Sequence, residues 1–163
     1  MADLTLDVAR KILDTALAKG VEKKLKPLVV TVLDARGCVK ISAAQDGTSL
    51  LRSEIAHGKA YGALAMGMGS RALFQRAQEQ AYFIGAVNTL AQGRMVPVPG
   101  GVLIQDGATL LGAVGVAGHL GRWRRRLDHG SGASHDLRRA WRCSLSRPGV
   151  ASRRLGERAG TVP

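Results

Sequence analysis

Apolar positions near the start of the chain recur every three or four residues, which is the spacing of an amphipathic helix. Thr5 has the side chain of a helix N-cap, and Gly20 stands where the pattern stops, so a helix is predicted between them. The apolar face of this helix is formed by Val8, Ile12, Leu13, Ala16 and Leu17.

Two β-type segments follow the first helix. Residues 28–34 read LVVTVLD, which is rich in β-branched side chains, and the small residues at 35–37 favour a turn. Residues 38–44 form a second extended segment. Together the two segments predict a β-hairpin.

The middle of the chain is predicted to be helical. Residues 50–68 form one helix that ends near Gly67 to Gly69, and Ser70 is the predicted N-cap of another helix over residues 71–80. Residues 81–92 continue as a short helix before Gly93. The apolar stripe of the first of these helices consists of Ile55, Tyr61, Leu64 and Ala65.

The last regular pattern is a second hairpin. Asp106-Gly107, a pair typical of tight hairpin turns, separates two β-type runs that extend from residue 102 to residue 118. The order of elements is therefore α-ββ-α-α-ββ. This order predicts an α+β fold, in which helices pack on an antiparallel sheet made of two hairpins.

Charge divides the chain in two. Residues 1–118 carry 13 Lys and Arg against 9 Asp and Glu, whereas residues 119–163 carry 11 Arg, no Lys and only 3 acidic residues, for a total net charge of +12. We therefore predict a domain over residues 1–118 and an Arg-rich tail over residues 119–163 that is disordered or poorly packed. The tail interleaves Trp with Arg, a pattern that also suits single-stranded nucleic acid, but no specific nucleic-acid partner is expected.

Several function classes find no support in the sequence. The first 20 residues mix charge with apolar residues, so they predict neither a secretory signal nor membrane insertion. Cys38 and Cys143 lie on opposite sides of the change in charge, so no structural disulfide is expected and a cytoplasmic location is predicted. The sequence has no phosphate-binding GxxxxGK[ST] motif, no HExxH and no GxSxG.

Four short motifs together resemble the GlcG/HbpS-like family of haem-degrading or haem-binding proteins, over nearly all of residues 1–118. They are a strand that ends in Asp before a small-residue turn, a Lys-Ala pair in the next helix, a Pro-Gly-Gly turn and a closing Gly-Val-x-Gly. In this sequence the motifs are Asp34 to Gly37, Lys59-Ala60, Pro99-Gly100-Gly101 and Gly115 to Gly118.

The resemblance stops after Gly118. Members of the family continue with an acidic turn and a last helix rich in Ala and Gly, whereas this chain continues with HLGRWRRRLDHG. A slip of the reading frame would account for the change, because Arg codons read one base later encode Asp, Glu, Ala, Val or Gly. The final helix of the family is therefore predicted to be absent, which would leave part of one sheet face uncovered.

The resemblance also implies candidate site residues. Lys59 would line a pocket for an anionic group such as a haem propionate, and His57 is a candidate iron ligand. Arg94 is a further candidate for an anion, and the backbone of Pro99, Gly100 and Gly101 is a candidate for close approach to a ligand. The alternative is that His57, Lys59 and Arg94 face solvent and that Pro99 to Gly101 only shape the entry to a strand.

Three functions remain open at this stage. The resemblance favours a small haem-binding accessory protein, and it implies a homo-oligomer with haem as ligand. The second is an enzyme or binding protein for a small organic acid, because relatives occur beside glycolate, propanediol and glycerol utilisation functions. The third is an oligomeric interaction module whose pocket has lost its ligand.

Overall fold

The computed structural model describes residues 3–118. The tail and its proposed frame slip lie outside these described residues. The order of elements confirms the predicted α-ββ-α-α-ββ arrangement and the α+β class. The elements are α1 (Leu6–Glu22), β1 (Val29–Asp34), β2 (Val39–Ala44), α2 (Arg52–Met66), α3 (Ser70–Glu79), α4 (Ala81–Leu90), β3 (Gly101–Asp106) and β4 (Thr109–Ala117).

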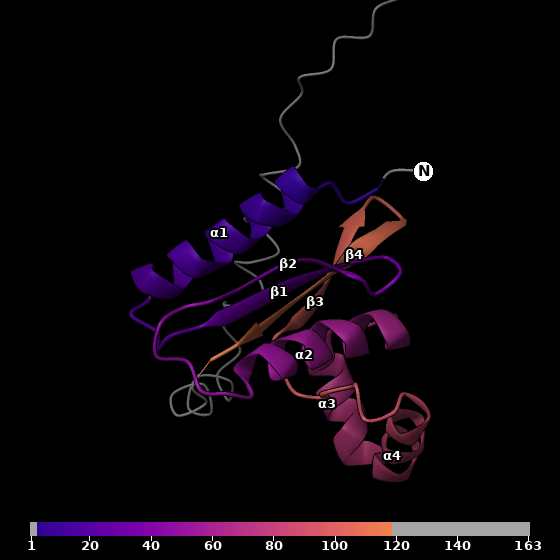
Figure 1. Ribbon diagram of the computed structural model, residues 1–163. Helices are drawn as coiled ribbons and strands as arrows, with labels where there is room; N and C mark the ends of the chain where they lie inside the picture. The colour runs from indigo at the N-terminus through magenta and orange to yellow at the C-terminus, as the bar shows by residue number, and fades with distance from the viewer. Residues whose placement is uncertain (1–2, 119–163) are drawn as a thin grey trace, which may run out of the picture. The chain divides into compact units, whose positions relative to one another are not determined.

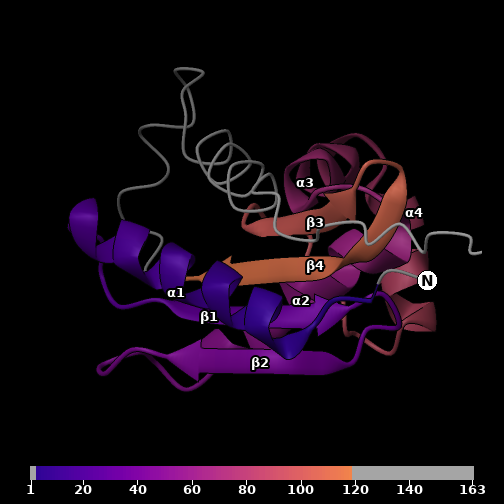
Figure 2. The same cartoon turned by 90° about the horizontal axis from the view of Figure 1, so that it is seen from above.

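The four strands form one antiparallel sheet in the order β2-β1-β4-β3, as Figure 2 shows. Each predicted hairpin is present, and the two hairpins join through β1 and β4, where Val29 pairs with Ala117 and Leu33 pairs with Ala113. All six residues of β1 are buried, whereas β2 at the edge is largely exposed. The core therefore lies along β1 and β4.

Helix α1 covers one face of the sheet, and α2 covers the other (Figure 1). The Thr5 hydroxyl accepts a hydrogen bond from Val8 N at 3.3 Å, which confirms the predicted N-cap. The predicted end at Gly20 is wrong, because α1 continues to Glu22. Gly20 is instead a packing position: a Cβ there would collide with the Leu28 side chain.

α2 lies very close to the sheet because small residues meet at the contact. A Cβ at Gly115 would overlap the Ala56 carbonyl, and Ala60 and Ala63 pack with Leu33 and Ala113 in the core. The predicted stripe is therefore not the buried face of α2. The buried residues of α2 are Ala56, Gly58, Lys59, Ala60, Gly62 and Ala63.

α3 packs on α2 and also contacts β3, and α4 packs on α3 (Figure 1). Ser70 is the first residue of α3 and not its N-cap, because Gly69 holds the cap position and the Ser70 hydroxyl points elsewhere. α2 ends at Gly67, which confirms the predicted end near Gly67 to Gly69, and Gly67 adopts the left-handed conformation. Within residues 3–118, no helix is both long enough and apolar enough to cross a bilayer.

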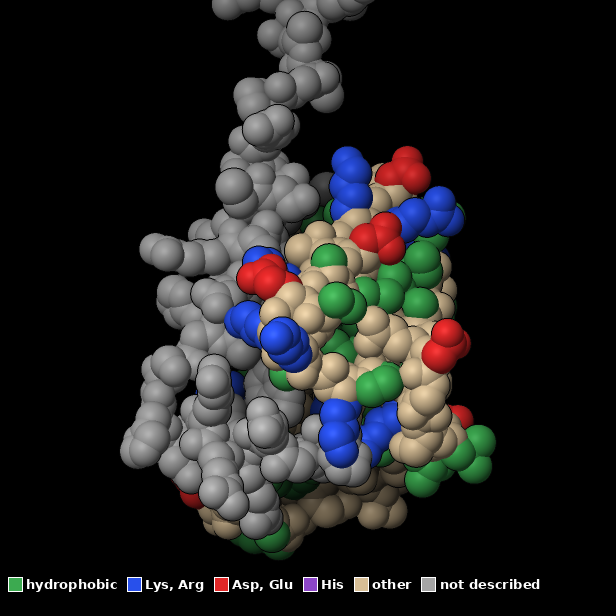
Figure 3. Space-filling model, turned by 90° about the vertical axis from the view of Figure 1, so that its left-hand side faces the viewer, with side chains coloured by type: hydrophobic (Ala, Val, Ile, Leu, Met, Phe, Trp, Pro, Cys, Tyr) green, Lys and Arg blue, Asp and Glu red, His purple; other side chains and the backbone are tan. Residues whose placement is uncertain are grey.

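α1 lies against β1 and β2, so residues 3–118 supply no comparable cover for β3 and β4 on that face. Whether residues 119–163 supply it lies outside the described part of the chain. On the face presented in Figure 3, Lys and Arg side chains are interspersed with Asp and Glu and with hydrophobic side chains. The described residues on that face therefore form no continuous basic patch.

Candidate functional site

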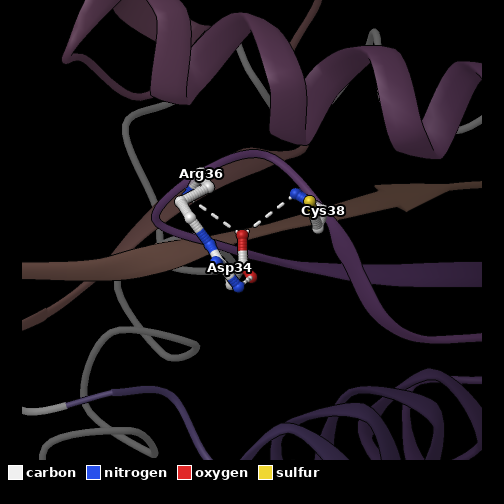
Figure 4. Close-up of polar contacts among 3 residues, drawn as sticks. All are labelled: Asp34, Arg36 and Cys38. Carbon is white, nitrogen blue, oxygen red and sulfur yellow. Dashed lines mark hydrogen bonds and ion pairs between the residues drawn. The ribbon is translucent and has the colours of Figure 1, made fainter.

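The turn between β1 and β2 is held by one buried carboxylate. Asp34 Oδ1 accepts hydrogen bonds from the backbone N–H groups of Arg36 at 2.9 Å and Cys38 at 3.0 Å (Figure 4). Burial raises the pKa of Asp34, but these hydrogen bonds and the Arg36 guanidinium outweigh it and leave the pKa below its ordinary value. The turn places Gly37 against the ring of Tyr61, where its hypothetical Cβ would lie 3.9 Å away.

Tyr61 is the centre of a polar and aromatic cluster on the side of α2 that faces this turn. The rings of His57 and Tyr61, one helical turn apart, stack with centroids 6.1 Å apart and planes inclined by 16°. The Arg94 guanidinium carbon lies 4.6 Å from the centre of the Tyr61 ring. We call His57, Tyr61 and Arg94 the imidazole cluster.

The backbone of the segment after α4 fixes Arg94 in this position. Val96 N donates to the Gly58 carbonyl at 3.1 Å, and Met95 N donates to Asn88 Oδ1 at 3.0 Å. Because Gly58 has no Cβ, residues 94–96 can lie directly on α2. Arg94 Nε then donates to the Ala91 carbonyl at 3.1 Å, and no carboxylate within residues 3–118 pairs with this guanidinium.

Lys59 lies on a different side of α2 and is buried, with only 5% of its surface exposed. Its Nζ donates to the Val116 carbonyl on β4 at 3.0 Å. Gly100, with φ of +127°, lies against the lysine side chain, and a Cβ there would be 3.1 Å from Nζ. The alternative in which Lys59 faces solvent is therefore wrong.

The Pro-Gly-Gly turn wraps around this lysine. Val116 N donates to the Gly100 carbonyl at 2.8 Å, and Gly101 N donates to the Ser70 hydroxyl at 2.6 Å. A Cβ at Gly101 would overlap the Lys59 carbonyl, so only glycine fits there. From the sequence, the Gly101 N–H was a candidate to donate a hydrogen bond to a ligand. In the structure it donates to the Ser70 hydroxyl.

The charge of Lys59 has no balancing carboxylate within the described residues. Burial, the larger cause, and the positive charge of Arg52 together lower its pKa to about 8. Among residues 3–118, the ammonium makes one hydrogen bond, to the Val116 carbonyl, although it carries three N–H donors. Its environment therefore disfavours the charged form and would favour an anion nearby.

The structure does not bring the two main candidates together. His57 and Lys59 are two positions apart, which is about 200° around a helix, and residues 94–96 pack on Gly58 between them. It does bring His57 and Arg94, which lie 37 positions apart in the sequence, each to the ring of Tyr61. Tyr61 was interpreted from sequence as a core residue. Its spacing of four residues from His57 was the signal that the two rings could stack on one side of the helix.

Within residues 3–118, no group of three or more His, Cys, Asp or Glu side chains is arranged to hold a metal ion. A porphyrin supplies most of its own iron ligands, so one imidazole is sufficient for axial coordination. Arg94 adds a cation over the phenol ring of Tyr61. The side chains of the imidazole cluster therefore have the chemistry that a haem group needs.

These features define a small α+β domain with two polar clusters on different sides of one helix. A family model described as haem degrading protein HbpS-like matches residues 4–123. The chain belongs to this family, which confirms the resemblance carried by the four sequence motifs.

Two proteins of Citrobacter freundii are similar in sequence. An uncharacterised 15.0 kDa protein from the dhaT-dhaS intergenic region is 30% identical over 118 residues, which cover 72% of this chain and 82% of that protein. The corrinoid adenosyltransferase PduO is 29% identical over 106 residues, or 65% of this chain and 31% of PduO. The chain thus spans about a third of the length of PduO.

The crystal structure of a PduOC:heme complex is similar in fold, with a TM-score of 0.65 and 24% sequence identity. The match covers 72% of this chain and 84% of that chain. At this level of identity, the likeness shows a shared fold.

Proposed function

We propose that this chain binds haem at the imidazole cluster, with His57 as an axial iron ligand. The observation that carries the proposal is that the His57 imidazole and the Arg94 guanidinium both lie against the ring of Tyr61, and that this guanidinium has no carboxylate partner within residues 3–118. Membership of the HbpS-like family and the fold shared with a haem-bound protein support it.

Each side chain of the cluster has a distinct part in this proposal. The imidazole of His57 supplies a nitrogen donor, and Tyr61 supplies an aromatic surface beside it. Arg94 pairs with a propionate, which would supply the carboxylate that its guanidinium lacks within the described residues. The haem, when bound, would supply the redox-active iron.

A haem titration of the purified full-length chain tests the proposal. The chain has four histidines, and the three besides His57 lie at positions 119, 129 and 135 among the arginines. We expect wild type to give a saturable Soret shift at one haem per chain in high salt. His57→Ala should weaken binding by at least about tenfold because the iron loses a ligand.

The matched control replaces the other three histidines together with alanine. This triple variant should bind haem as wild type does. If it loses the Soret shift while His57→Ala keeps it, haem is held by residues 119–163 and the proposal for the imidazole cluster is wrong.

A second candidate function rests on Lys59. A buried ammonium with no described carboxylate partner, next to the positive charge of Arg52, favours a small organic acid as ligand. A carboxylate at this position would complete the hydrogen bonds of Nζ and remove part of the cost of burying its charge.

A thermal-shift screen with small mono- and dicarboxylic acids tests this second candidate. An acid that binds at Lys59 should raise the melting temperature of wild type but not that of Lys59→Met. Haem binding at the imidazole cluster should be unchanged in Lys59→Met, so the two candidates can fail independently. Equal shifts in wild type and variant would exclude Lys59 as the binding residue.

A further inference from the structure

Lys59 is the one buried lysine among residues 3–118, and haem binding at the imidazole cluster leaves its amine unused. The other lysines, at positions 11, 19, 23, 24, 26 and 40, are exposed or partly exposed. An amine is a nucleophile only in its neutral form, which burial and a neighbouring cation both favour. Lys59 has both features, since burial and the charge of Arg52 lower its pKa.

The structure holds this amine close to the protein surface. Nζ donates to the Val116 carbonyl at 3.0 Å, so the lone pair of the neutral amine points away from that oxygen. Gly100 lies on the lysine side chain, and a Cβ there would be 3.1 Å from Nζ. Because Gly100 is partly exposed and has no side chain, a layer of backbone covers the amine at this point.

Arg52 places a second cation on the same side of α2. Lys59 follows Arg52 by seven positions, which is about 20° short of two helical turns. Side chains in a helix lean toward its N-terminus, so Lys59 leans toward Arg52. Within residues 3–118, Arg52 donates to the Ser49 hydroxyl at 3.2 Å and pairs with no carboxylate.

We propose that Lys59 captures a small 2-oxo acid as an imine. The proposal rests on the second candidate function, in which Lys59 binds a small organic acid. The neutral amine attacks the carbonyl carbon, a C–N bond forms, and a proton from the nitrogen converts the carbonyl oxygen to a hydroxyl. The hydroxyl then leaves with the second nitrogen proton as water, and a C=N bond to Nζ remains. The step consumes no oxidant or reductant.

The charges at this site favour a carboxylate next to the carbonyl. The ammonium form of Lys59 attracts an anion, and Arg52 keeps its charge after Lys59 has released its proton. In a 2-oxo acid the carboxylate is bonded to the carbonyl carbon, so an anion held by these charges brings the carbonyl to Nζ. A simple aldehyde lacks the group for Arg52, and a hydroxy acid lacks the carbonyl for Lys59.

Reductive trapping of the full-length chain with pyruvate and sodium cyanoborohydride tests the proposal. The reagent reduces an imine to a stable amine, which peptide mapping assigns to one of the lysines. At pH 7.5, about a quarter of Lys59 is neutral, against about a thousandth of a lysine with the ordinary pKa of 10.5. We expect label on Lys59 at least about tenfold faster than on any other lysine, at a rate that rises with pH and levels off above about pH 8.

Three controls separate the parts of the proposal. Lactate, which has a hydroxyl in place of the carbonyl, should slow labelling of Lys59 and leave no label itself. Arg52→Gln should slow labelling by pyruvate at least about threefold and labelling by propanal less. In Lys59→Met, shown to be folded by circular dichroism, the other lysines should be labelled as in wild type.

Label on Lys59 that forms no faster than label on the exposed lysines would overturn the imine. If pyruvate and lactate then still raise the melting temperature of wild type but not of Lys59→Met, the second candidate function stands and only the covalent step fails. Labelling of Lys59 by propanal as fast as by pyruvate would overturn the assignment of a 2-oxo acid.

Discussion

Replacing Lys59 with methionine keeps an unbranched side chain, one heavy atom shorter, but removes its charge. Lys59 is buried, donates to the Val116 carbonyl and has no carboxylate partner within residues 3–118. At neutral pH, methionine loses that hydrogen bond, at a cost of about 1 kcal/mol or more. It also abolishes the cost of burying an ammonium, so the two effects partly cancel.

The dependence on pH separates these two effects. The pKa of Lys59 falls from its ordinary value of 10.5 to about 8 in the folded protein, which corresponds to about 3 kcal/mol. Below pH 8 both folded and unfolded chains hold the proton, so the cost is constant. Between about pH 8 and 10.5 the folded chain has released the proton and the unfolded chain has not, so the stability of wild type rises with pH.

Urea unfolding of wild type and Lys59→Met at several pH values between 7 and 10.5 measures this difference. Subtracting the two free energies of unfolding cancels the other lysines, the tyrosines and Cys38. We expect wild type to gain about 3 kcal/mol relative to the variant across this range. If the free energy of unfolding of wild type minus that of Lys59→Met stays constant over this pH range, Lys59 is not a buried ammonium without a partner. If that difference falls as pH rises, Lys59 has an acidic partner.

Substitutions at three further positions test the packing and the turns. Gly115→Ala should destabilise the fold by about 3 kcal/mol or more, since its Cβ would overlap the Ala56 carbonyl, and an unchanged melting temperature would contradict the close contact. Ser70→Ala should cost about 1–3 kcal/mol by leaving the Gly101 N–H without an acceptor, whereas Ser70→Thr, if its hydroxyl keeps the bond, should lose less. The pKa of Asp34 is lowered from its ordinary value of 3.8, so wild type should be more stable than Asp34→Asn by a full, constant amount above pH 3.8. This stability advantage should shrink as pH falls below 3.8. An advantage that grew on acidification would contradict the observed hydrogen bonds.

Local sequence signals were sufficient for the elements of the fold. Thr5 has a capping side chain at the start of a regular apolar pattern, and Asp106-Gly107 separates two β-type runs, so both the helix and the hairpin follow from neighbouring residues. Gly20 was misassigned because a glycine that ends a helix and a glycine that admits a packed side chain look the same in sequence. Only the position of Leu28 distinguishes the two.

The buried face of α2 could not be predicted for the same reason. Periodicity selects large apolar residues, but the contact with β4 is so close that it admits Ala56 and Ala60 and requires Gly115. Lys59 is buried beside them because its stem passes under Gly100 and its Nζ reaches Val116, which is 57 positions away in the sequence. No local pattern reports such a contact.

The candidate site was predicted in part. His57, Lys59 and Arg94 were all proposed as site residues, but their division into two clusters depends on residues 94–96 packing against Gly58. That contact brings Arg94 to Tyr61 and separates it from Lys59. The roles of these residues in binding stay predictions.

Chemical rescue of His57→Gly tests most directly the claim that His57 coordinates haem iron. The variant removes the imidazole and leaves Tyr61 and Arg94 in place, so added imidazole can take the vacated position. We expect the haem spectrum of the variant to differ from that of wild type and to return to it, saturably, as imidazole is added. A variant whose haem spectrum and affinity equal those of wild type before any imidazole is added would contradict the account.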